Sequence, residues 1–480
     1  MHSLLLDRAR FVALVVALTG SGAGCAPVEA HEHNSAAQGA VSSDGRPADQ
    51  RPARSVPPAY ESLVRSALRE IEGRVALAGD RHVDTRIALD RALERLAFGG
   101  RDLEEGYRLA MRSLVSAFPI GHLVVYPGSE SQCGAEGLPM ASSSLVDACP
   151  QPFGDHVVIS MAATGNPLEL ERGDEIMAVD GKSGAAMLDA AFAQPMCAGG
   201  SPSLAHRRAL SATSLLSAVR VGSVVSIRHA NGATESKTLA RLTPPRACHD
   251  PLGRDVRYAA QASLRTDGAA VIHIPSFFPP DNDAADVAGS LERFRTAIRV
   301  EFQKVQQAPW LVIDVRGNRG GYPDVSMAIA AGLPGARPLA KAIRCQSRVP
   351  FTQQYGGAID YDFAPSNEFE YRGKVAILSD GLSFSATDYF LRVVRLATSA
   401  IVVGRPSAGA YGGSESAVAL GVANGPGAVL FPDPWRCTDA AGQIIEGQNV
   451  RPDLEEDLLP TDLAQGVDTD VETAVRLLRR

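Results

Sequence analysis

The sequence of 480 residues has no apolar run long enough to cross a membrane and no excess of basic residues. Its one strongly apolar run, Phe11–Leu18, is eight residues long, whereas a membrane-spanning helix needs about 20. Lys and Arg number 47 against 54 Asp and Glu, for a net charge of −7. A general nucleic-acid binder needs a basic face that replaces phosphate counterions, so we expect neither a transmembrane helix nor a nucleic-acid partner.

Two patterns that would support other kinds of chemistry are also missing. None of the seven cysteines belongs to a Cys-x-x-Cys pair, so a zinc knuckle is not expected and no metal or cofactor is implied. No lysine follows Lys374, which leaves the C-terminal part of the chain without a lysine base. The remaining composition, with 45% hydrophobic and 21% charged residues, is typical of a soluble globular protein of about two to four domains.

The N-terminus is typical of a targeting segment. Two arginines precede the apolar run Phe11–Leu18, small residues follow at 20–24, and Cys25 comes next. This order predicts a secretory signal peptide over residues 1–24. Cys25 resembles the lipid-accepting cysteine of a bacterial lipoprotein, and the alternative is ordinary cleavage after Ala30. We expect an exported protein that is either lipid-anchored at the cell envelope through Cys25 or periplasmic, with no other membrane contact.

Hydrophobic patterning divides the rest of the chain into four parts. Residues 25–56 are rich in Ala, Ser, Gly, Pro and Asp and are predicted to form a disordered tether. Apolar residues recur at helical spacing over 57–120, which predicts an N-terminal helical bundle. Short apolar runs alternate with turn residues over 121–250, which indicates a β-rich domain with flanking loops. Over 251–480 strands alternate with helices, as in an α/β domain with buried strands.

Individual elements of this last part can be placed by their apolar runs. The pattern predicts strands and helices in alternation, at 269–274, 285–305, 310–314, 325–333, 374–378, 386–397 and 400–403.

The cysteines agree with export, because disulfides form in oxidising compartments. Without Cys25, six cysteines remain, and they allow 15 pairings. We predict Cys133–Cys149, which closes a short loop at little entropic cost. The remaining pairs are then expected to be Cys197–Cys248 in the β-rich domain and Cys345–Cys437 in the α/β domain.

One segment of the β-rich domain resembles a known signature. Leu170–Gly181 is similar to the Gly-Asp-x-Ile-x-x-Val-Asp-Gly pattern of PDZ domains, carried here by Gly173, Asp174, Ile176, Asp180 and Gly181. Asp180-Gly181 is also typical of a tight hairpin turn, so the alternative is any small β-domain with one good hairpin. The resemblance implies binding of peptide chain ends by strand addition.

Four further segments resemble one family of enzymes. Residues 118–123, 311–321, 377–388 and 446–453 are similar, in order, to the His, Gly-rich, nucleophile and Glu-Gly segments of the C-terminal processing (tail-specific) and tricorn-core serine peptidases. The resemblance extends over most of 60–455. It implies a crotonase-like (ClpP/crotonase) α/β core that acts on protein or peptide substrates.

Ser385 matches the family's nucleophile. It follows an apolar strand and a polar loop and opens a helix, where exposed backbone N–H groups favour a developing oxyanion. The alternative is a helix cap, because Ser385 and Asp388 are spaced as in a capping box. The resemblance implies that the N–H of Gly320 or Gly321, together with that of Ala386, forms the oxyanion hole.

The base and the supporting acid follow from the same resemblance. The tail-specific branch uses a lysine after the serine, but Ala410 stands at that position. The tricorn-like branch uses an upstream histidine, which His122 matches, with His273 as the competing candidate. A neutral imidazole, with an unperturbed pKa of about 6.5, can accept a serine proton at neutral pH. Glu446 matches the acid that orients this site.

Together these observations predict an exported serine-type endopeptidase with Ser385 as nucleophile, His122 as general base and Glu446 in support. The alternative is a catalytically inactive peptide-binding module that retains the peptidase fold. Asp314 and Arg316, in the Gly-rich segment, are expected to be scaffold.

Overall fold

The computed structural model describes residues 53–81, 83–100, 102–127, 143–193, 200–244, 246–248, 259–281, 283, 285–414, 417–421 and 426–480. The predicted signal peptide, Cys25 and almost all of the predicted tether lie outside the described residues, as do Cys133 and Cys197. Within these ranges no helix combines the length and the apolar character that crossing a membrane requires.

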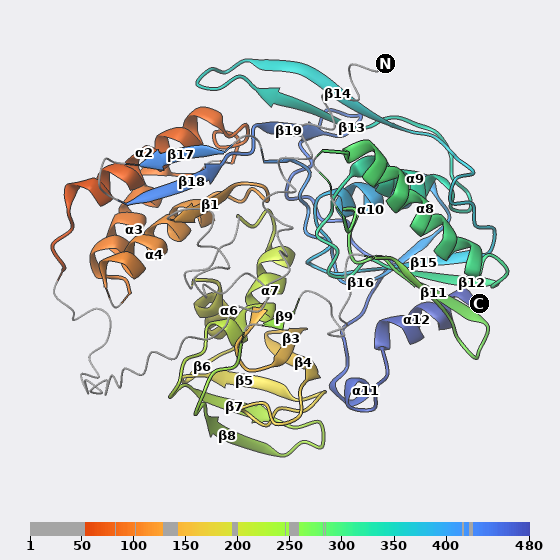
Figure 1. Ribbon diagram of the computed structural model, residues 1–480, viewed down its shortest axis with the longest axis horizontal. Coiled ribbons are helices and arrows are strands. Elements are labelled where there is room, and N and C mark those ends of the chain that lie inside the picture. The colour runs from red at the N-terminus through yellow and green to blue at the C-terminus, as the bar shows by residue number, and fades with distance from the viewer. Residues whose placement is uncertain are drawn as a thin grey trace.

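Three helices occupy the N-terminal part, α2 (Pro58–Arg74), α3 (Thr85–Phe98) and α4 (Leu103–Ser116) (Figure 1). Asp84 and Asp102 cap α3 and α4, because each side chain accepts a backbone N–H from the first turn. The buried faces of the helices share one core with a three-stranded antiparallel sheet. The sheet consists, in spatial order, of β1 (Val124–Pro127), β18 (Gly427–Phe431) and β17 (Val418–Gly421). Segments about three hundred residues apart in sequence therefore complete the same layer.

The β-rich part is built on an antiparallel sheet. Its strands are, in spatial order, β3 (Ala148–Phe153), β4 (His156–Ala162), β5 (Glu175–Val179), β7 (Val224–Arg228) and β8 (Thr234–Thr238), with β6 (Lys182–Ser183) paired to β5. Helices α6 (Gly184–Phe192) and α7 (Leu204–Thr213) pack on it. The hairpin turn between β5 and β6 is where the sequence predicts it, with φ of 50° at Asp180 and 74° at Gly181. Ile176 is buried in this core, and Asp174 accepts the N–H of Glu171.

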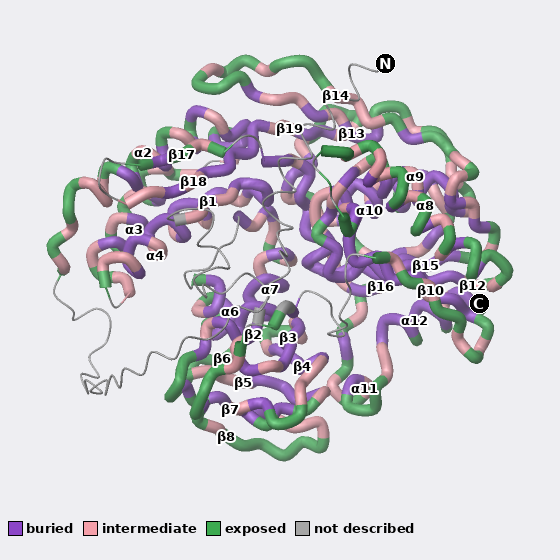
Figure 2. Tube along the Cα trace, viewed as in Figure 1, coloured by how far each residue is buried: buried purple, intermediate pink, exposed green. Residues whose placement is uncertain are grey.

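A six-stranded sheet forms the α/β part. Its order is β10 (Gln261–Leu264), β11 (Ala269–His273), β12 (Trp310–Asp314), β15 (Lys374–Ser379), β16 (Ile401–Gly404) and β20 (Leu454–Glu455), parallel except for β10. Leu311 and Ile313 face the core beneath α8 (Val287–Val305), α9 (Pro323–Ala331) and α10 (Ala386–Ala397). Val312 faces α12 (Thr469–Leu478) on the opposite side. Burial on both faces explains why these strands are continuous apolar runs, and Figure 2 shows this sheet and α10 as largely buried.

A third sheet joins the N-terminal and α/β parts. It has the order β14 (Tyr355–Phe363), β13 (Leu339–Arg348) and β19 (Trp435–Thr438), all antiparallel. The long β13–β14 hairpin arches over the top of the molecule in Figure 1. The short helix α11 (Pro460–Ala464) connects the α/β part to the β-rich part, since Leu463 packs against Val158.

The disulfides confirm one predicted pair and correct two. Cys345 and Cys437 are bonded and directly opposed on β13 and β19, as predicted. The predictions Cys133–Cys149 and Cys197–Cys248 are wrong, because Cys149 is bonded to Cys248 across 99 residues. The short strands β2 (Ser143–Ser144) and β9 (Arg246–Ala247) pair with each other and bring these two cysteines together. Strand pairing thus outweighed the entropic advantage of a short loop.

Candidate active site

Ser385 lies at the N-terminus of α10 in a backbone conformation that side chains rarely adopt. Its φ is 60° and its ψ is −120°, outside the regions that L-residues favour, so the turn is strained. The carboxylate of Asp388 accepts the Ser385 N–H at 3.1 Å, and the capping box predicted from the sequence is present. Gly320 packs against the same turn, since a Cβ atom there would lie 2.6 Å from the Ser385 Cβ.

His122 approaches Ser385 from the N-terminal part of the chain. It lies between α4 and β1, and its Nε2 atom is 2.9 Å from the Ser385 Oγ, although 263 residues separate the two in sequence. His122 is buried, and its ring packs on the Phe384 ring at 4.6 Å. A Cβ atom at Gly121 would lie 2.7 Å from the Ala410 Cβ, so glycine permits this close approach.

The environment of His122 favours a neutral imidazole. Burial, with a smaller contribution from His206, lowers the pKa of His122 to about 3. A neutral ring carries a proton on one nitrogen and a lone pair on the other. The Nε2 atom can therefore accept the Ser385 proton if Nδ1 carries the ring proton. The Asp433 Oδ2 atom lies 4.0 Å from Nδ1.

The competing histidine from the sequence and the serine two residues before Ser385 have other partners. His273 ends β11, and its Nδ1 is 3.5 Å from the Asp314 carboxylate in the neighbouring strand. Ser383 is fully buried, and its hydroxyl donates to the Val315 carbonyl at 2.9 Å. Among the described contacts, Ser385 is the serine that meets an imidazole nitrogen.

Glu446 is buried beside His122 and bonds to the backbone rather than to the ring. One carboxylate oxygen accepts the Gly121 N–H at 2.8 Å, and the other accepts the Tyr411 N–H at 2.6 Å. Burial raises the pKa of Glu446, and these two N–H donors oppose the rise. Any orienting effect of Glu446 on the site thus acts through the peptide that precedes His122.

The Gly-rich turn supplies backbone donors next to Ser385. The Gly320 N–H donates to the Asn318 side chain at 2.8 Å. Within the described part of the chain, the N–H groups of Gly321 and Ala386 donate no hydrogen bond to the protein. Gly321 and Ala386 are therefore the two predicted donors that remain available to an oxyanion.

We predict that Gly320→Ala lowers kcat by about 10²–10³-fold, because the added Cβ would displace Ser385 or the adjacent Ala386 N–H, which lies 2.9 Å away. The Gly320 φ of 97° adds strain for any other residue. Gly268→Ala is the matched control, since Gly268 has a φ of 86° and open space around it. Steady-state peptide hydrolysis by both variants tests this, and equal activity would show that the close contact at Gly320 is not needed.

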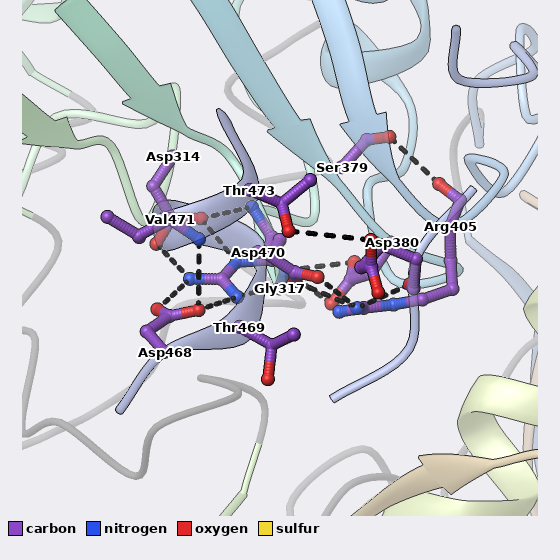
Figure 3. Close-up of polar contacts among 12 residues, drawn as sticks. Asp314, Gly317, Ser379, Asp380, Arg405, Asp468, Thr469, Asp470, Val471 and Thr473 are labelled. Carbon is purple, nitrogen blue, oxygen red and sulfur yellow. Dashed lines mark hydrogen bonds and ion pairs between the residues drawn. The ribbon is translucent and has the colours of Figure 1, made fainter. Parts of the chain in front are cut away.

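A largely buried network of ion pairs supports the Gly-rich turn (Figure 3). Arg316 donates to Asp314, Asp468 and Asp470, and Arg405 donates to Asp470 as well. Burial alone would lower the pKa of Arg316, but these carboxylates raise it well above its ordinary value. Asp314 and Arg316 thus have the scaffold role expected from sequence, and through them α12 is tied to the Gly-rich turn.

Asp380 extends this support to the loop that precedes Ser385. Its carboxylate accepts the N–H of Gly317 at 3.0 Å and that of Leu382 at 3.0 Å. Asn318 adds a second connection, because its carbonyl accepts the Phe384 N–H at 3.0 Å. The Gly-rich turn and the loop before Ser385 are therefore held as one unit.

The β-rich part also contributes to the site, which the sequence did not predict. His206 on α7 is buried, its Nδ1 lies 2.8 Å from the Gly381 carbonyl, and its ring packs on Phe384 at 5.1 Å. Ser203 donates to the Ala408 carbonyl at 2.7 Å. Phe384 thus lies between two imidazoles, and α7 docks on the loop that precedes Ser385.

These buried histidines predict a pH-dependent loss of stability. Burial lowers the pKa of His206 to about 4, so its neutral form stabilises the fold above pH 6.5 and this contribution is lost as the pH falls toward 4. Relative to His206→Gln, the wild type should lose up to about 1.4 kcal/mol per pH unit in this range. Urea unfolding of both proteins measures the difference in their free energies of unfolding. A difference that stays constant between about pH 7 and about pH 4.5 would contradict the prediction.

The wild type is compared with His206→Gln because another buried group changes the stability of the fold in the opposite direction as the pH falls. Burial raises the pKa of Asp388 to about 7, so this carboxyl favours the folded state as the pH falls. Asp388 is unchanged in both proteins, and its effect cancels.

The described residues hold no cluster of three or more His, Cys, Asp or Glu side chains suited to a metal ion. Asp433 and His206 are the site residues that sequence reasoning missed. Neither lies in a recognisable motif, and no local pattern in the sequence marks them.

A serine at a strained turn, an imidazole nitrogen within reach of its hydroxyl and unbonded backbone N–H groups nearby are the arrangement that a serine hydrolase requires. Residues 268–456 match the model of "Peptidase family S41". Over this part, the chain is similar to this family of serine-type peptidases.

Solved structures of one protein, CPAF, show the same fold at low sequence identity. Mature CPAF complexed with lactacystin has a TM-score of 0.63 and 14% identity, over 88% of this chain and 98% of that chain. Mature CPAF by itself has a TM-score of 0.62 and 14% identity, over 88% and 96%. The photosystem II D1 C-terminal processing protease has 16% identity over 88% and 97%, with a TM-score of 0.42. No curated protein sequence matches the chain significantly.

Proposed function

We propose that this protein is a serine endopeptidase of the Ser–His type, with Ser385 as nucleophile and His122 as general base and then general acid. The observation that carries the proposal is the 2.9 Å contact between the His122 Nε2 and the Ser385 Oγ. A base within hydrogen-bond reach of a serine hydroxyl is the geometric requirement for activating it.

The geometry supports a two-step acyl transfer. The Ser385 Oγ forms a bond to the carbonyl carbon of the scissile peptide while its proton passes to the His122 Nε2. The N–H groups of Gly321 and Ala386 would donate to the resulting oxyanion. His122 then gives the proton to the leaving amine, and a water molecule, deprotonated by the same imidazole, releases the acyl group.

Ala410 supports the histidine branch of the family over the lysine branch. It stands where the tail-specific branch carries its lysine, its N–H donates to Asp388 at 2.9 Å, and its Cβ packs against Gly121. A longer side chain at this position would occupy the space through which the His122 loop approaches Ser385. The small residue is therefore consistent with a base that comes from upstream.

We also propose a domain organisation and a cellular localisation for the protein. We assign residues 57–120 to a helical bundle, 121–250 to a PDZ-like domain and 251–480 to a crotonase-like peptidase core. The PDZ-like domain would bind peptide chain ends by strand addition, close to the site because α7 docks there. A signal peptide would direct export, and the mature chain would be lipid-anchored at Cys25 or free in the periplasm.

Labelling with a fluorophosphonate tests the proposal directly. An activated serine reacts with this probe, and peptide mapping should place the label on Ser385. The wild-type protein should also hydrolyse an unfolded protein substrate. A protein that binds peptides but neither hydrolyses them nor takes up the label would instead be a peptide-binding module with the peptidase fold.

A further inference from the structure

Asp433 faces the side of the His122 ring that is remote from Ser385. Its Oδ2 atom is 4.0 Å from the His122 Nδ1, and the two side chains are 1% and 7% exposed. The Nδ1 atom is buried and makes no hydrogen bond within the described part of the chain. A buried N–H that donates to nothing is costly, so a carboxylate on this side of the ring is a significant neighbour.

The Asp433 carboxylate is held rigidly in this place. Its Oδ1 atom accepts the N–H of Gly413 at 3.2 Å and that of Trp435 at 3.0 Å. A Cβ atom at Gly412 would lie 2.0 Å from Oδ2, so the chain passes the carboxylate at a distance that only glycine permits. Two residues after Asp433, β19 begins and is bonded to β13 through Cys437.

The peptide of His122 is fixed from the same side. The Ser414 hydroxyl donates to the His122 carbonyl at 2.6 Å. Residues 412–414 therefore contact both Asp433 and His122 and keep the distance between them short. A distance of 4.0 Å is too long for a hydrogen bond, but contacts of this kind often shorten when substrate or a transition state occupies the site.

We propose that Asp433 is the positioning residue of His122, which holds the ring proton on Nδ1 and stabilises the imidazolium that forms during catalysis. This inference rests on the proposed function. When the Ser385 proton reaches Nε2, the ring becomes positively charged and Nδ1–H donates to the Asp433 Oδ2. In this step no proton moves to Asp433.

The other charged groups around His122 do not fill this role. Glu446 bonds to the backbone N–H of Gly121, and Asp388 accepts from the backbone of Ser385 and Ala410 on the nucleophile side. His206 lies beyond the Phe384 ring. Among the described side chains, the carboxylate that faces Nδ1 is that of Asp433.

The test is Asp433→Asn, which keeps the shape and the Oδ1 acceptor for Gly413 and Trp435. Its amide would present N–H toward Nδ1 and favour the wrong tautomer, with the proton on Nε2. We expect kcat to fall by about 10²–10⁴-fold with little change in KM, because the interaction strengthens only in the transition state. Glu446→Gln is the comparison variant, and it should leave the ring tautomer as in the wild type.

The ring proton provides a readout that does not depend on activity. With ¹⁵N-labelled histidine, the wild-type chain bearing a phosphonate on Ser385 should show a low-field Nδ1–H resonance for His122. Loss of this resonance in Asp433→Asn would support the proposal. If that variant does not fold, the spectrum of the wild-type adduct is sufficient as a test. Absence of a low-field Nδ1–H signal in that spectrum overturns the proposal.

The two hypotheses fail in different ways. If wild-type Ser385 takes no label and no peptide is cleaved, the proposed function is wrong. If Ser385 and His122 are both essential but Asp433→Asn keeps the wild-type kcat and the wild-type resonance, only the positioning role of Asp433 is overturned.

Discussion

Replacing Ser385 by alanine is expected to abolish peptide hydrolysis and fluorophosphonate labelling while the chain stays folded. The hydroxyl lies 2.9 Å from the His122 Nε2, and without it no acyl-enzyme can form. Loss of a catalytic serine typically lowers kcat by about 10⁶-fold. The cost in stability is small, about 0.5–2 kcal/mol even if the hydroxyl also contributes to the helix cap. Stopped assays with a peptide substrate, together with thermal unfolding, measure both effects.

Ser383→Ala is the control for this variant. Ser383 lies two residues away, but its hydroxyl is bonded to the Val315 carbonyl and to the Asp380 carboxylate. This variant should lose some stability and keep the fluorophosphonate label. If Ser385→Ala hydrolyses peptides at the wild-type rate, or if the label follows Ser383 instead, Ser385 is not the nucleophile.

Replacing His122 by alanine should have an effect of similar size, about 10⁴–10⁶-fold in kcat/KM, because the serine loses the base that lies within hydrogen-bond reach of its hydroxyl. The pH dependence offers a second test. Burial lowers the pKa of His122 to about 3, so the imidazole stays neutral well below pH 6.5. The activity of the wild type should therefore decline at a pH clearly lower than an unperturbed histidine would give.

His273→Ala serves as the histidine control, since His273 lies beside Asp314 in the sheet and away from Ser385. It should keep the position of the acidic limb of kcat/KM, whereas His122→Ala should have none. A His122→Ala enzyme with wild-type kcat/KM would show that another group accepts the serine proton. An acidic limb of the kcat/KM profile at about pH 8 or above would indicate a lysine base instead.

The elements of the α/β part could be placed from local sequence alone. The strand predicted at 310–314 is β12, and the helix predicted at 386–397 is α10. Long apolar runs between turn residues mark strands that are buried on both faces, and this periodicity needs no knowledge of the rest of the chain. The position of Ser385 at a strand–loop–helix junction follows from the same local signals.

The tertiary structure decided which distant segments meet. His122 and Ser385 are 263 residues apart, and the sequence connects them only through the family resemblance. Cys149 pairs with Cys248 because β2 and β9 pair. No local pattern reports such strand pairing, since it depends on the register and packing of the whole sheet.

The partners of the site carboxylates and the pKa of the imidazole were also decided by the tertiary structure. Motif spacing identified Glu446, but only the fold shows that it bonds to the backbone at Gly121 and that Asp433 faces the ring. The low pKa of His122 arises from burial between parts of the chain that the sequence treats as separate domains. By itself, the sequence determined the elements and the turn that carries Ser385, because these depend on neighbours in the chain. The partners of the imidazole depend on neighbours in space, and only the tertiary structure decided them.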